Sequence, residues 1–171
     1  MTAAITDETT ARIRDAALGL FAERGYGNTT IEHISTAAQV GVATIYRRWP
    51  DKASIANELY ADGLESMAEI LAEPADGPPR EQFIEIWNRV WHWAADHREM
   101  LVFVNASAGA PWLAPHNVDR KAAISAHEVE MYGRLQIDAA PDFAASLIAG
   151  ALASVLALEP DIEPGEVGAR L

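Results

Sequence analysis

The spacing of apolar residues along the chain is that of α-helix almost throughout. In residues 7–24 the apolar positions recur at intervals of three and four, the repeat of one helix face, and are Ile13, Ala16, Ala17, Leu20 and Phe21. Gly25 and Gly27 follow, and glycine commonly stands just beyond the last turn of a helix. The pattern therefore predicts a first helix that ends near residue 24.

Two short helices are predicted next. The run TTIE at 29–32 fits a capping box, in which the Thr29 hydroxyl accepts from the backbone three residues on and Glu32 reaches back. A helix of about ten residues follows, with Ile31, Ile34 and Ala38 facing inward. Residues 39–41 form a tight connection to a second short helix, from 42 to about 48, which Pro50 and Asp51 end.

The rest of the chain also reads as helices. We expect them at 52–71, 81–97, 98–107, 116–136 and 141–158, with a short last one at 166–171 and a loop at 108–115. The run EPADGPPR at 73–80 is a clear break. No strand pattern is present. The prediction is an all-α protein with an N-terminal domain over 1–52 and a second helical domain over 53–171, joined by the long helix 52–72.

Composition narrows the possible classes of protein. Half of the 171 residues are hydrophobic, which is typical of a folded globular chain. There is no cysteine, so disulfides, cysteine zinc sites and thiol catalysis are excluded. The N-terminal residues are polar and acidic, and no apolar run reaches the roughly 18 residues that a membrane span needs. We therefore expect a soluble cytoplasmic protein that makes no membrane contact.

The formal net charge of −12 is unevenly distributed. Residues 1–60 have a net charge of −1 and residues 61–171 of −11, whereas 41–52 alone carry +2. At physiological salt the screening length is about 8 Å, so a basic segment can act almost independently of a distant acidic body. The sequence GVATIYRRWPDK at 41–52 is thus a candidate contact for a polyanion.

Two short helices joined by a tight turn and braced by a longer one form a helix-turn-helix, whose second helix fits the major groove of DNA. The segment TTIEHISTAAQVGVATIYRRWPDK at 29–52 resembles the DNA-binding segment of TetR-type (tetracycline-repressor-like) transcriptional regulators. The matching features are the Thr pair, the core positions Ile34, Ala38 and Val40, and the T-I-Y-x-x-W-P-x-K tail. The resemblance is specific over about residues 10–60. Beyond them it covers only the general plan of a helical ligand-binding and dimerisation domain.

Candidate DNA contacts follow from side-chain chemistry. The Tyr46 hydroxyl suits a phosphate, arginines neutralise phosphates or pair with guanine, and short side chains let a helix approach bases. The candidates are Thr29, Thr30, Val42, Ala43, Thr44, Tyr46, Arg47, Arg48 and Lys52. The resemblance implies a DNA contact for Val42, Ala43, Thr44, Tyr46, Arg48 and Lys52.

Other interpretations of these residues remain open. Tyr46 could be a core aromatic residue, and Arg47 and Arg48 a solvated pair. Trp49 is expected in the core, and Glu32 is expected to act as a cap. Gln39 stands where the family usually has Gly, and a positive φ there would cost about 1 kcal/mol. The cap at Gly41, usually Ser or Thr, is slightly weaker.

An aromatic stripe in the acidic part suggests a small-molecule pocket. The candidate lining residues are Trp87, Trp91, Met100, Phe103, Trp112, Met131 and Tyr132. Asn88, His92, Asn105 and His127 could supply polar contacts, whereas Trp93 is expected to point away from Trp91. The alternative is that the stripe is ordinary core. The resemblance implies that an apolar or aromatic molecule fills the pocket and releases DNA.

Enzymatic and metal-binding functions have little support. His92, Asp96 and His97 share a helix, but this spacing is frequent by chance, and no catalytic motif is present. We expect no enzyme, no cofactor and no metal. The apolar helix 142–158 is a candidate dimer contact, and the resemblance implies a homodimer on a near-palindromic operator. A helical interaction module with a purely structural helix-turn-helix is the alternative, followed by an enzyme on a helical scaffold.

Overall fold

The computed structural model describes residues 2–134, apart from the side chains of residues 2–7 and 132. Within them the chain forms helices and no strand: α1 (Thr2–Asn28), α2 (Ile31–Ala38), α3 (Val42–Arg48), α4 (Lys52–Ala72), α5 (Pro79–Asp96), α6 (Arg98–Ala106) and α7 (Pro115–Arg134). The all-α prediction is confirmed for this part of the chain. The helices expected at 141–158 and 166–171 lie outside the described residues.

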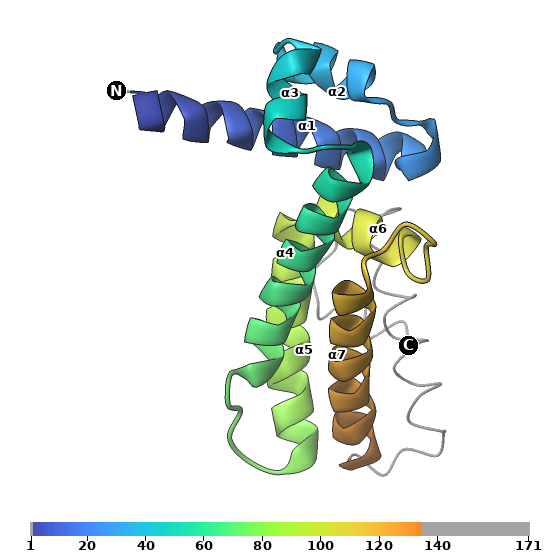
Figure 1. The fold of residues 1–171 in the computed structure, drawn as a ribbon. Helices are drawn as coiled ribbons and strands as arrows, with labels where there is room; N and C mark the ends of the chain where they lie inside the picture. The colour runs from blue at the N-terminus through green and yellow to red at the C-terminus, as the bar shows by residue number, and fades with distance from the viewer. Residues whose placement is uncertain (1, 135–171) are drawn as a thin grey trace.

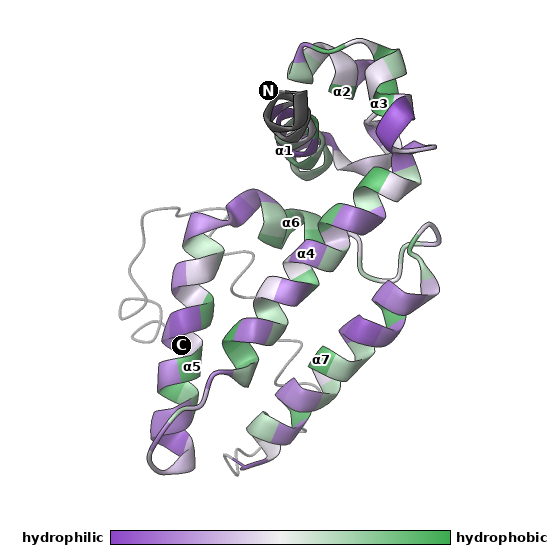
Figure 2. Ribbon diagram, turned by 60° about the vertical axis from the view of Figure 1, so that its left-hand side comes forward, coloured by the Kyte–Doolittle hydropathy of each residue, from purple (hydrophilic) through white to green (hydrophobic). Residues whose placement is uncertain are grey.

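The helices form two layers (Figure 1). Helices α1, α2 and α3 pack together at one end, and α4 runs from them alongside α5 and α7. Helix α6 lies across the junction, because it packs on both α1 and α4. Apolar residues recur between polar ones along α4 (Figure 2), and the buried residues include Leu59 and Leu64 of α4 and Leu101 and Phe103 of α6. One buried cluster runs from Ile13 and Phe21 on α1 through Tyr60 on α4 to Phe103 on α6, so both layers share a core.

The predicted end of the first helix marks a real change in the backbone. Gly25 has φ 79° and ψ 159°, which is not helical, and a last turn then continues to Asn28. Because an L side chain rarely adopts a positive φ, glycine suits this position. The kink leaves Tyr26 free to pack on Phe21, with ring centroids 5.7 Å apart.

The capping box of α2 is displaced by one residue from its prediction. Thr30 is the N-cap: its hydroxyl accepts from the His33 amide at 3.2 Å, while the Thr30 amide donates to His33 Nδ1 at 3.3 Å. Thr29 is fully buried, and its hydroxyl donates to the carbonyls of Leu20 and Gly25. The first threonine of the pair therefore ties the turn to α1, and the prediction that it caps α2 is wrong.

Gln39 occupies the left-handed conformation in the turn between α2 and α3, with φ 55° and ψ 45°. Its backbone amide is bonded to Thr36 O at 3.2 Å, so the turn is well formed despite the strain of a side chain at this φ. The sequence suggested a positive φ here only as a condition, and the structure has it.

Replacing Gln39 with glycine is expected to raise the free energy of unfolding by about 0.5–1 kcal/mol, because glycine adopts this φ without a steric cost. The measurement is urea unfolding of the two proteins, followed by circular dichroism. A Gln39→Ala protein serves as the control, since alanine keeps the Cβ and should leave the stability nearly unchanged. Equal stability of Gln39→Gly and the natural protein would contradict the expected strain.

Helix α4 is tied to α7 by an amide network that the sequence pattern does not reveal. Asn57 donates to Trp112 O at 3.0 Å and accepts from the Ala114 amide at 2.6 Å. The fully buried Asn117 donates to both the backbone O and the Oδ1 of Asn57, each at 3.0 Å. These hydrogen bonds hold the loop between α6 and α7 against the N-terminal half of α4.

Helix α6 approaches α4 closely at Gly63. A Cβ at Gly63 would lie 2.7 Å from Val104 Cγ2 and 2.9 Å from Met100 Sδ, both on α6. Real side-chain contacts do not come this close, so the crossing of α4 and α6 depends on the missing side chain. No helix of the described residues is long and apolar enough to cross a membrane.

Candidate DNA interface and effector pocket

Helix α3 is anchored by two buried residues and presents the rest of its surface to solvent. Ile45 is fully buried and Trp49, which follows the helix, is 3% exposed. Ala43, Tyr46 and Arg47 lie on the exposed side, and half of the Tyr46 surface is accessible. A phenol exposed this far is poorly placed for core packing, so the interpretation of Tyr46 as a core aromatic is wrong, and Trp49 takes that role as expected.

A polar cluster fixes the turn between α3 and α4. The indole N–H of Trp49 donates to Glu58 at 2.7 Å, and Arg14 of α1 pairs with Glu58 and Asp62. The Arg48 guanidinium lies 5.6 Å from the Trp49 ring and 3.9 Å from Glu58, yet remains 58% exposed. Arg14 is therefore committed to the fold, whereas Arg48 keeps most of its surface in water.

A cleft between the N-terminal half of α1 and α3 is lined by cations and hydroxyls. Its volume is about 560 Å³, and its polar lining comprises Thr9, Thr10, Arg12, Thr44, Arg47 and Arg48. Within the described residues Arg12 makes no ion pair, and Arg47 donates to the Thr44 hydroxyl at 3.2 Å. The cleft carries a positive charge and is open beside the exposed face of α3. Arg12 was not among the sequence candidates, because only the fold brings α1 beside α3.

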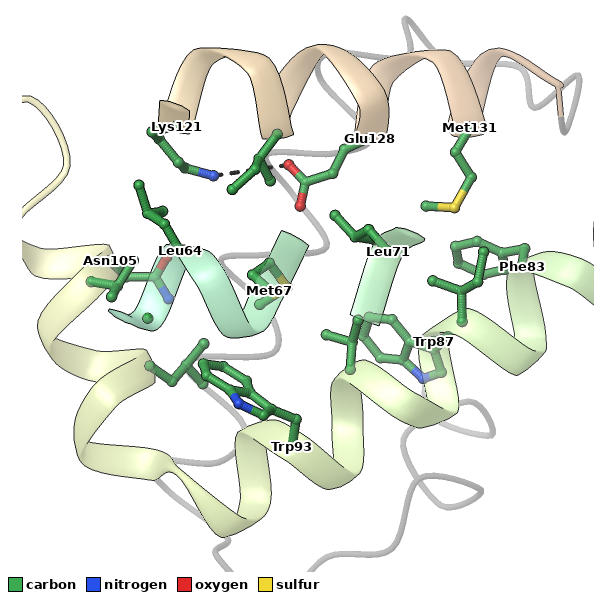
Figure 3. A pocket seen from close by; sticks show the side chains of 16 residues that line it. Leu64, Met67, Leu71, Phe83, Trp87, Trp93, Asn105, Lys121, Glu128 and Met131 are labelled. Carbon is green, nitrogen blue, oxygen red and sulfur yellow. Dashed lines mark ion pairs between the residues drawn. The ribbon is translucent and has the colours of Figure 1, made fainter. Parts of the chain in front are cut away.

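A second cavity lies among α4, α5, α6 and α7 (Figure 3). Its volume is about 80 Å³, and its walls are mostly apolar: Leu64, Met67 and Leu71 from α4, Phe83, Ile86, Trp87, Val90 and Trp93 from α5, Leu101 and Val104 from α6, and Ile124 and Met131 from α7. The polar lining residues are Asn105, Lys121 and Glu128. Aromatic walls with a few polar groups are typical of small-molecule sites.

The charged groups of this cavity come from one helix. Lys121 and Glu128 are seven residues apart on α7, and their Nζ and Oε2 atoms lie 3.9 Å apart. Burial raises the pKa of the Glu128 carboxyl, and the charges of Lys121 and His127 only partly oppose this. The carboxylate therefore lies in a weakly solvated place within an apolar pocket.

The comparisons with known proteins agree with the geometry at the N-terminal end. Residues 13–59, which hold most of α1, all of α2 and α3 and the start of α4, match the model of the bacterial regulatory proteins of the tetR family. The N-terminal domain belongs to the tetR family. The described architecture of a helix-turn-helix followed by a helical body is the tetR fold.

The similar proteins extend this result. An uncharacterised HTH-type transcriptional regulator of Mycobacterium tuberculosis is 27% identical over 112 residues, which cover 63% of this chain and 54% of the relative. A second one from that species is 34% identical over 79 residues, 46% of this chain and 40% of the relative. The chain thus spans about half the length of the curated relatives that it matches.

Solved structures of the tetR fold are similar along most of the chain. A bacterial regulatory protein in the tetR family from Rhodococcus RHA1 superposes with a TM-score of 0.75 at 22% identity, covering 95% of this chain and 92% of that one. The ketosteroid transcriptional regulator KstR2 of Mycobacterium tuberculosis gives 0.73 at 18% identity, covering 94% and 89%. These likenesses show the fold.

Two residues predicted to contact DNA instead make hydrogen bonds within this tetR domain. The hydroxyl of Thr29 is buried and donates to two backbone carbonyls, as described above, so in this conformation it does not face a phosphate. The Lys52 ammonium donates to the carbonyls of Tyr26 and Thr29, each at 2.6 Å, and lies 4.0 Å from the Tyr26 ring centroid. Desolvation lowers the pKa of Lys52. It braces the end of α1 against the start of α4.

The other candidates keep some surface. Thr30 is exposed although its hydroxyl caps α2, and Ala43, Tyr46, Arg47 and Arg48 are exposed on or beside α3. Thr44 is half-buried at the basic cleft. Val42 is half-buried against the core, so only part of its side chain is available.

The predicted ligand residues divide between the pocket and the core. Trp87 and Met131 line the cavity. Trp91 lies in a separate buried cluster with Ala94 and Leu101, and Phe103 stacks on Phe21 at 5.4 Å. Trp91 and Phe103 therefore do not line this cavity, because both rings are buried in other contacts. The side chain of Tyr132 lies outside the described residues.

Met100 and Trp112 are also absent from the cavity lining. Met100 packs against Gly63, and Trp112 stacks on Tyr26 with ring centroids 4.4 Å apart, where it joins the loop after α6 to α1. Trp93, expected to point elsewhere, does line the cavity, and so does Asn105. The sequence stripe identified the correct helix α5, but not which of its tryptophans face α4 and α7.

Among the described residues, no group of three His, Cys, Asp or Glu side chains could hold a metal ion. His92 Nδ1 is 2.6 Å from Asn88 O, and His97 Nδ1 is 2.9 Å from Trp93 O. Both imidazoles therefore bond to backbone carbonyls of α5.

Proposed function

We propose that this chain is a DNA-binding transcriptional regulator that holds a near-palindromic operator as a homodimer and releases it when a small molecule fills the cavity beside α7. The observation that supports this proposal is that α3 has one buried face and one exposed face. Ile45 and Trp49 are buried, while Ala43, Tyr46 and Arg47 face solvent. A helix held in this way can enter a major groove without disturbing the core.

The basic cleft extends the proposed interface beyond α3. Arg12 and Arg47 flank it from α1 and α3, and the Thr9, Thr10 and Thr44 hydroxyls add hydrogen-bonding groups. Arginines and hydroxyls are the usual partners of backbone phosphates. We assign base contacts to the exposed face of α3 around Ala43 and Tyr46, and phosphate contacts to Arg12, Arg47 and Arg48.

The operator itself can be found by selecting random DNA duplexes with the purified protein at about physiological salt. We expect an enriched near-palindrome, because a two-fold dimer presents two copies of α3. The Tyr46→Ala and Arg48→Ala double variant should not enrich it. Recovery of the same palindrome by that variant would remove α3 from the interface, and no enrichment by the natural protein would favour a structural helix-turn-helix.

The salt dependence of binding tests the basic cleft. In an Arg12→Ala and Arg47→Ala protein the slope of log affinity against log salt should fall by about two units, because each phosphate contact releases about 0.9 counterions. The measurement is fluorescence anisotropy of a labelled duplex at several salt concentrations.

The matched control for this measurement is Arg80→Ala. Arg80 is exposed at the start of α5, at the far end of the molecule from α3 (Figure 1). The Arg80→Ala variant changes the net charge without changing the cleft. The slope of log affinity against log salt for this variant should therefore equal that of the natural protein. A double variant of the cleft that behaves like this control would show that Arg12 and Arg47 do not contact phosphates.

Helix α6 is the proposed route from the cavity to the DNA-binding end. Leu101 and Val104 of α6 line the cavity, while Phe103 of the same helix stacks on Phe21 of α1. An occupied cavity that moves α6 would therefore move α1. This supports a ligand-responsive regulator over a helical interaction module, which needs no such shared wall. The 142–158 helix remains the proposed dimer contact.

A further inference from the structure

The charged pair of the cavity restricts which molecules can bind there. Lys121 and Glu128 reach into the space from the α7 side (Figure 3), with 3.9 Å between Nζ and Oε2. This distance is too long for a hydrogen bond. Within the described residues neither group makes a hydrogen bond to another side chain or to the backbone. Among residues 2–134, the Lys121 ammonium and the Glu128 carboxylate thus face each other across 3.9 Å with no hydrogen bond.

Both groups are partly buried beside apolar residues, with 35% of the Lys121 side chain and 22% of the Glu128 side chain exposed. Ile124 lies between them in the sequence of α7 and lines the cavity. The aromatic side chains of Phe83, Trp87 and Trp93 line the cavity from α5 (Figure 3). A charged group that loses water without gaining a hydrogen bond is unfavourable. A ligand that displaces water here must therefore satisfy the ammonium and the carboxylate together.

We propose that the cavity recognises an uncharged apolar or aromatic molecule that bears a hydroxyl group, with the hydroxyl placed between Lys121 and Glu128. A hydroxyl donates one hydrogen bond, here to the Glu128 carboxylate, and accepts another, here from the Lys121 ammonium. This inference rests on the proposed effector role of the cavity and names the class of effector.

Charged ligands fit the pair less well. A ligand ammonium that reached Glu128 would lie within a few ångströms of the Lys121 ammonium, and a ligand carboxylate at Lys121 would lie equally near Glu128. Like charges this close repel strongly when water is excluded. A purely apolar ligand would desolvate both groups and give nothing in return. Only a neutral group with a donor and an acceptor avoids all three costs.

The size of the space indicates how much of the ligand it takes. Its 80 Å³ is smaller than the roughly 150 Å³ of a cavity known to hold benzene, so a single ring requires the walls to give way. Met67 and Met131 are suited to this because methionine side chains are flexible. A neighbouring hollow of about 250 Å³ shares Leu71, Ile86 and Met131 with the cavity and offers room for the rest of the molecule.

The test uses four probes of one shape: benzyl alcohol, benzylamine, benzoate and toluene. Their binding to the full chain is measured by the change in tryptophan fluorescence and by isothermal titration calorimetry, because Trp87 and Trp93 line the cavity. We expect benzyl alcohol to bind about tenfold or more tightly than each of the others, the difference that a hydrogen bond to a charged group makes.

Two variants should change which probe binds most tightly, one in favour of the anion and the other in favour of the cation. Glu128→Gln leaves the Lys121 ammonium alone and should make benzoate the best ligand, whereas Lys121→Met leaves the carboxylate alone and should favour benzylamine. Asp119→Asn is the matched control: its carboxylate is exposed on the same helix, and the variant should keep the preference for the alcohol.

Equal affinities for the four probes in the natural protein, or an unchanged order in both variants, would overturn the inference. Failure of all four to bind would do the same. Operator selection with the natural protein separates these results from the regulator proposal. If the operator is found and the alcohol has no advantage, the effector class is wrong while the DNA-binding function stands.

Discussion

An Asn57→Ala protein is expected to unfold with a free energy about 3 kcal/mol lower than that of the natural protein. Asn57 accepts from the Ala114 amide and from Asn117, and donates to Trp112 O. Alanine would remove these three bonds and a fourth to Ala53 O. Asn117 would keep the Asn57 backbone O, but Trp112 O and the Ala114 amide would lose their Asn57 partner, and each buried group left unpaired costs about 1–3 kcal/mol. The network has little reserve, because Asn117 Oδ1 is already buried without a partner among the described residues.

Urea unfolding followed by circular dichroism measures this loss, with Asn88→Ala as the control. Asn88 is exposed on α5, and its side chain makes no hydrogen bond within the described residues. Its removal should change the stability by less than about 0.5 kcal/mol. If Asn57→Ala proved no more damaging than the control, the amide network would have no part in holding α7 and the preceding loop to α4.

The second large effect is expected at Gly63. A Gly63→Val protein should lose about 2–3 kcal/mol of stability, because overpacking of a filled contact has costs of this size. The added Cβ would meet Val104 Cγ2 at 2.7 Å, and the branched valine at position 104 has little freedom to turn away. Since Gly63 also lines the cavity, the extra side chain should weaken the binding of any small molecule there.

Thermal unfolding and probe titration of the same protein measure both consequences. Gly27→Ala is the matched control, because a Cβ at Gly27 meets nothing within 4 Å and that position should tolerate alanine without loss. A Gly63→Val protein as stable as this control would mean that α6 can move away from α4 at no cost. The proposed route from the cavity to α1 would then lack a rigid wall.

Much of the helical order could be predicted from sequence because it depends on local features. The bounds of α3 and α4 follow from Pro50 and from Asp51, whose carboxylate accepts from the Ser54 amide at 2.7 Å as a cap should. Gln39 was identified as a position where a positive φ would be strained, but the sequence did not predict that φ. The choice between Thr29 and Thr30 was missed, because either threonine can cap a helix and the core decides which one turns inward. The expectation that Glu32 completes the capping box was wrong as well, since the His33 side chain does so.

The cavity was harder to predict because periodicity does not say which neighbour a helix face meets. Trp87 and Trp91 lie on the same face of α5, and their ring centroids are 6.1 Å apart. Of these two tryptophans, only Trp87 lines the cavity. Trp112 and Phe103 stack toward Tyr26 and Phe21 and so serve the junction with α1. Lys121 and Glu128 were not identified from the sequence, since their common direction depends on where α7 packs.

Arg12 illustrates the same limit at the DNA-binding end. In sequence it is one cation among several acidic residues, 35 positions before Arg47. The packing of α1 on the helix-turn-helix places both at one cleft. Residues with clear local signals were thus found from sequence, and those that depend on long-range packing were not.

The stacking of Phe21 on Phe103 limits how the DNA-binding part of this protein could be transferred to another regulator. A hybrid regulator made by joining residues 1–52 to another helical body would leave Phe21, and Tyr26 beside it, without the aromatic partners that α6 and Trp112 supply. The hybrid would expose an apolar surface where the two parts are joined, and such a surface promotes aggregation. The transplantable piece is therefore larger than its helix-turn-helix, and includes the surface of α6 on which α1 rests.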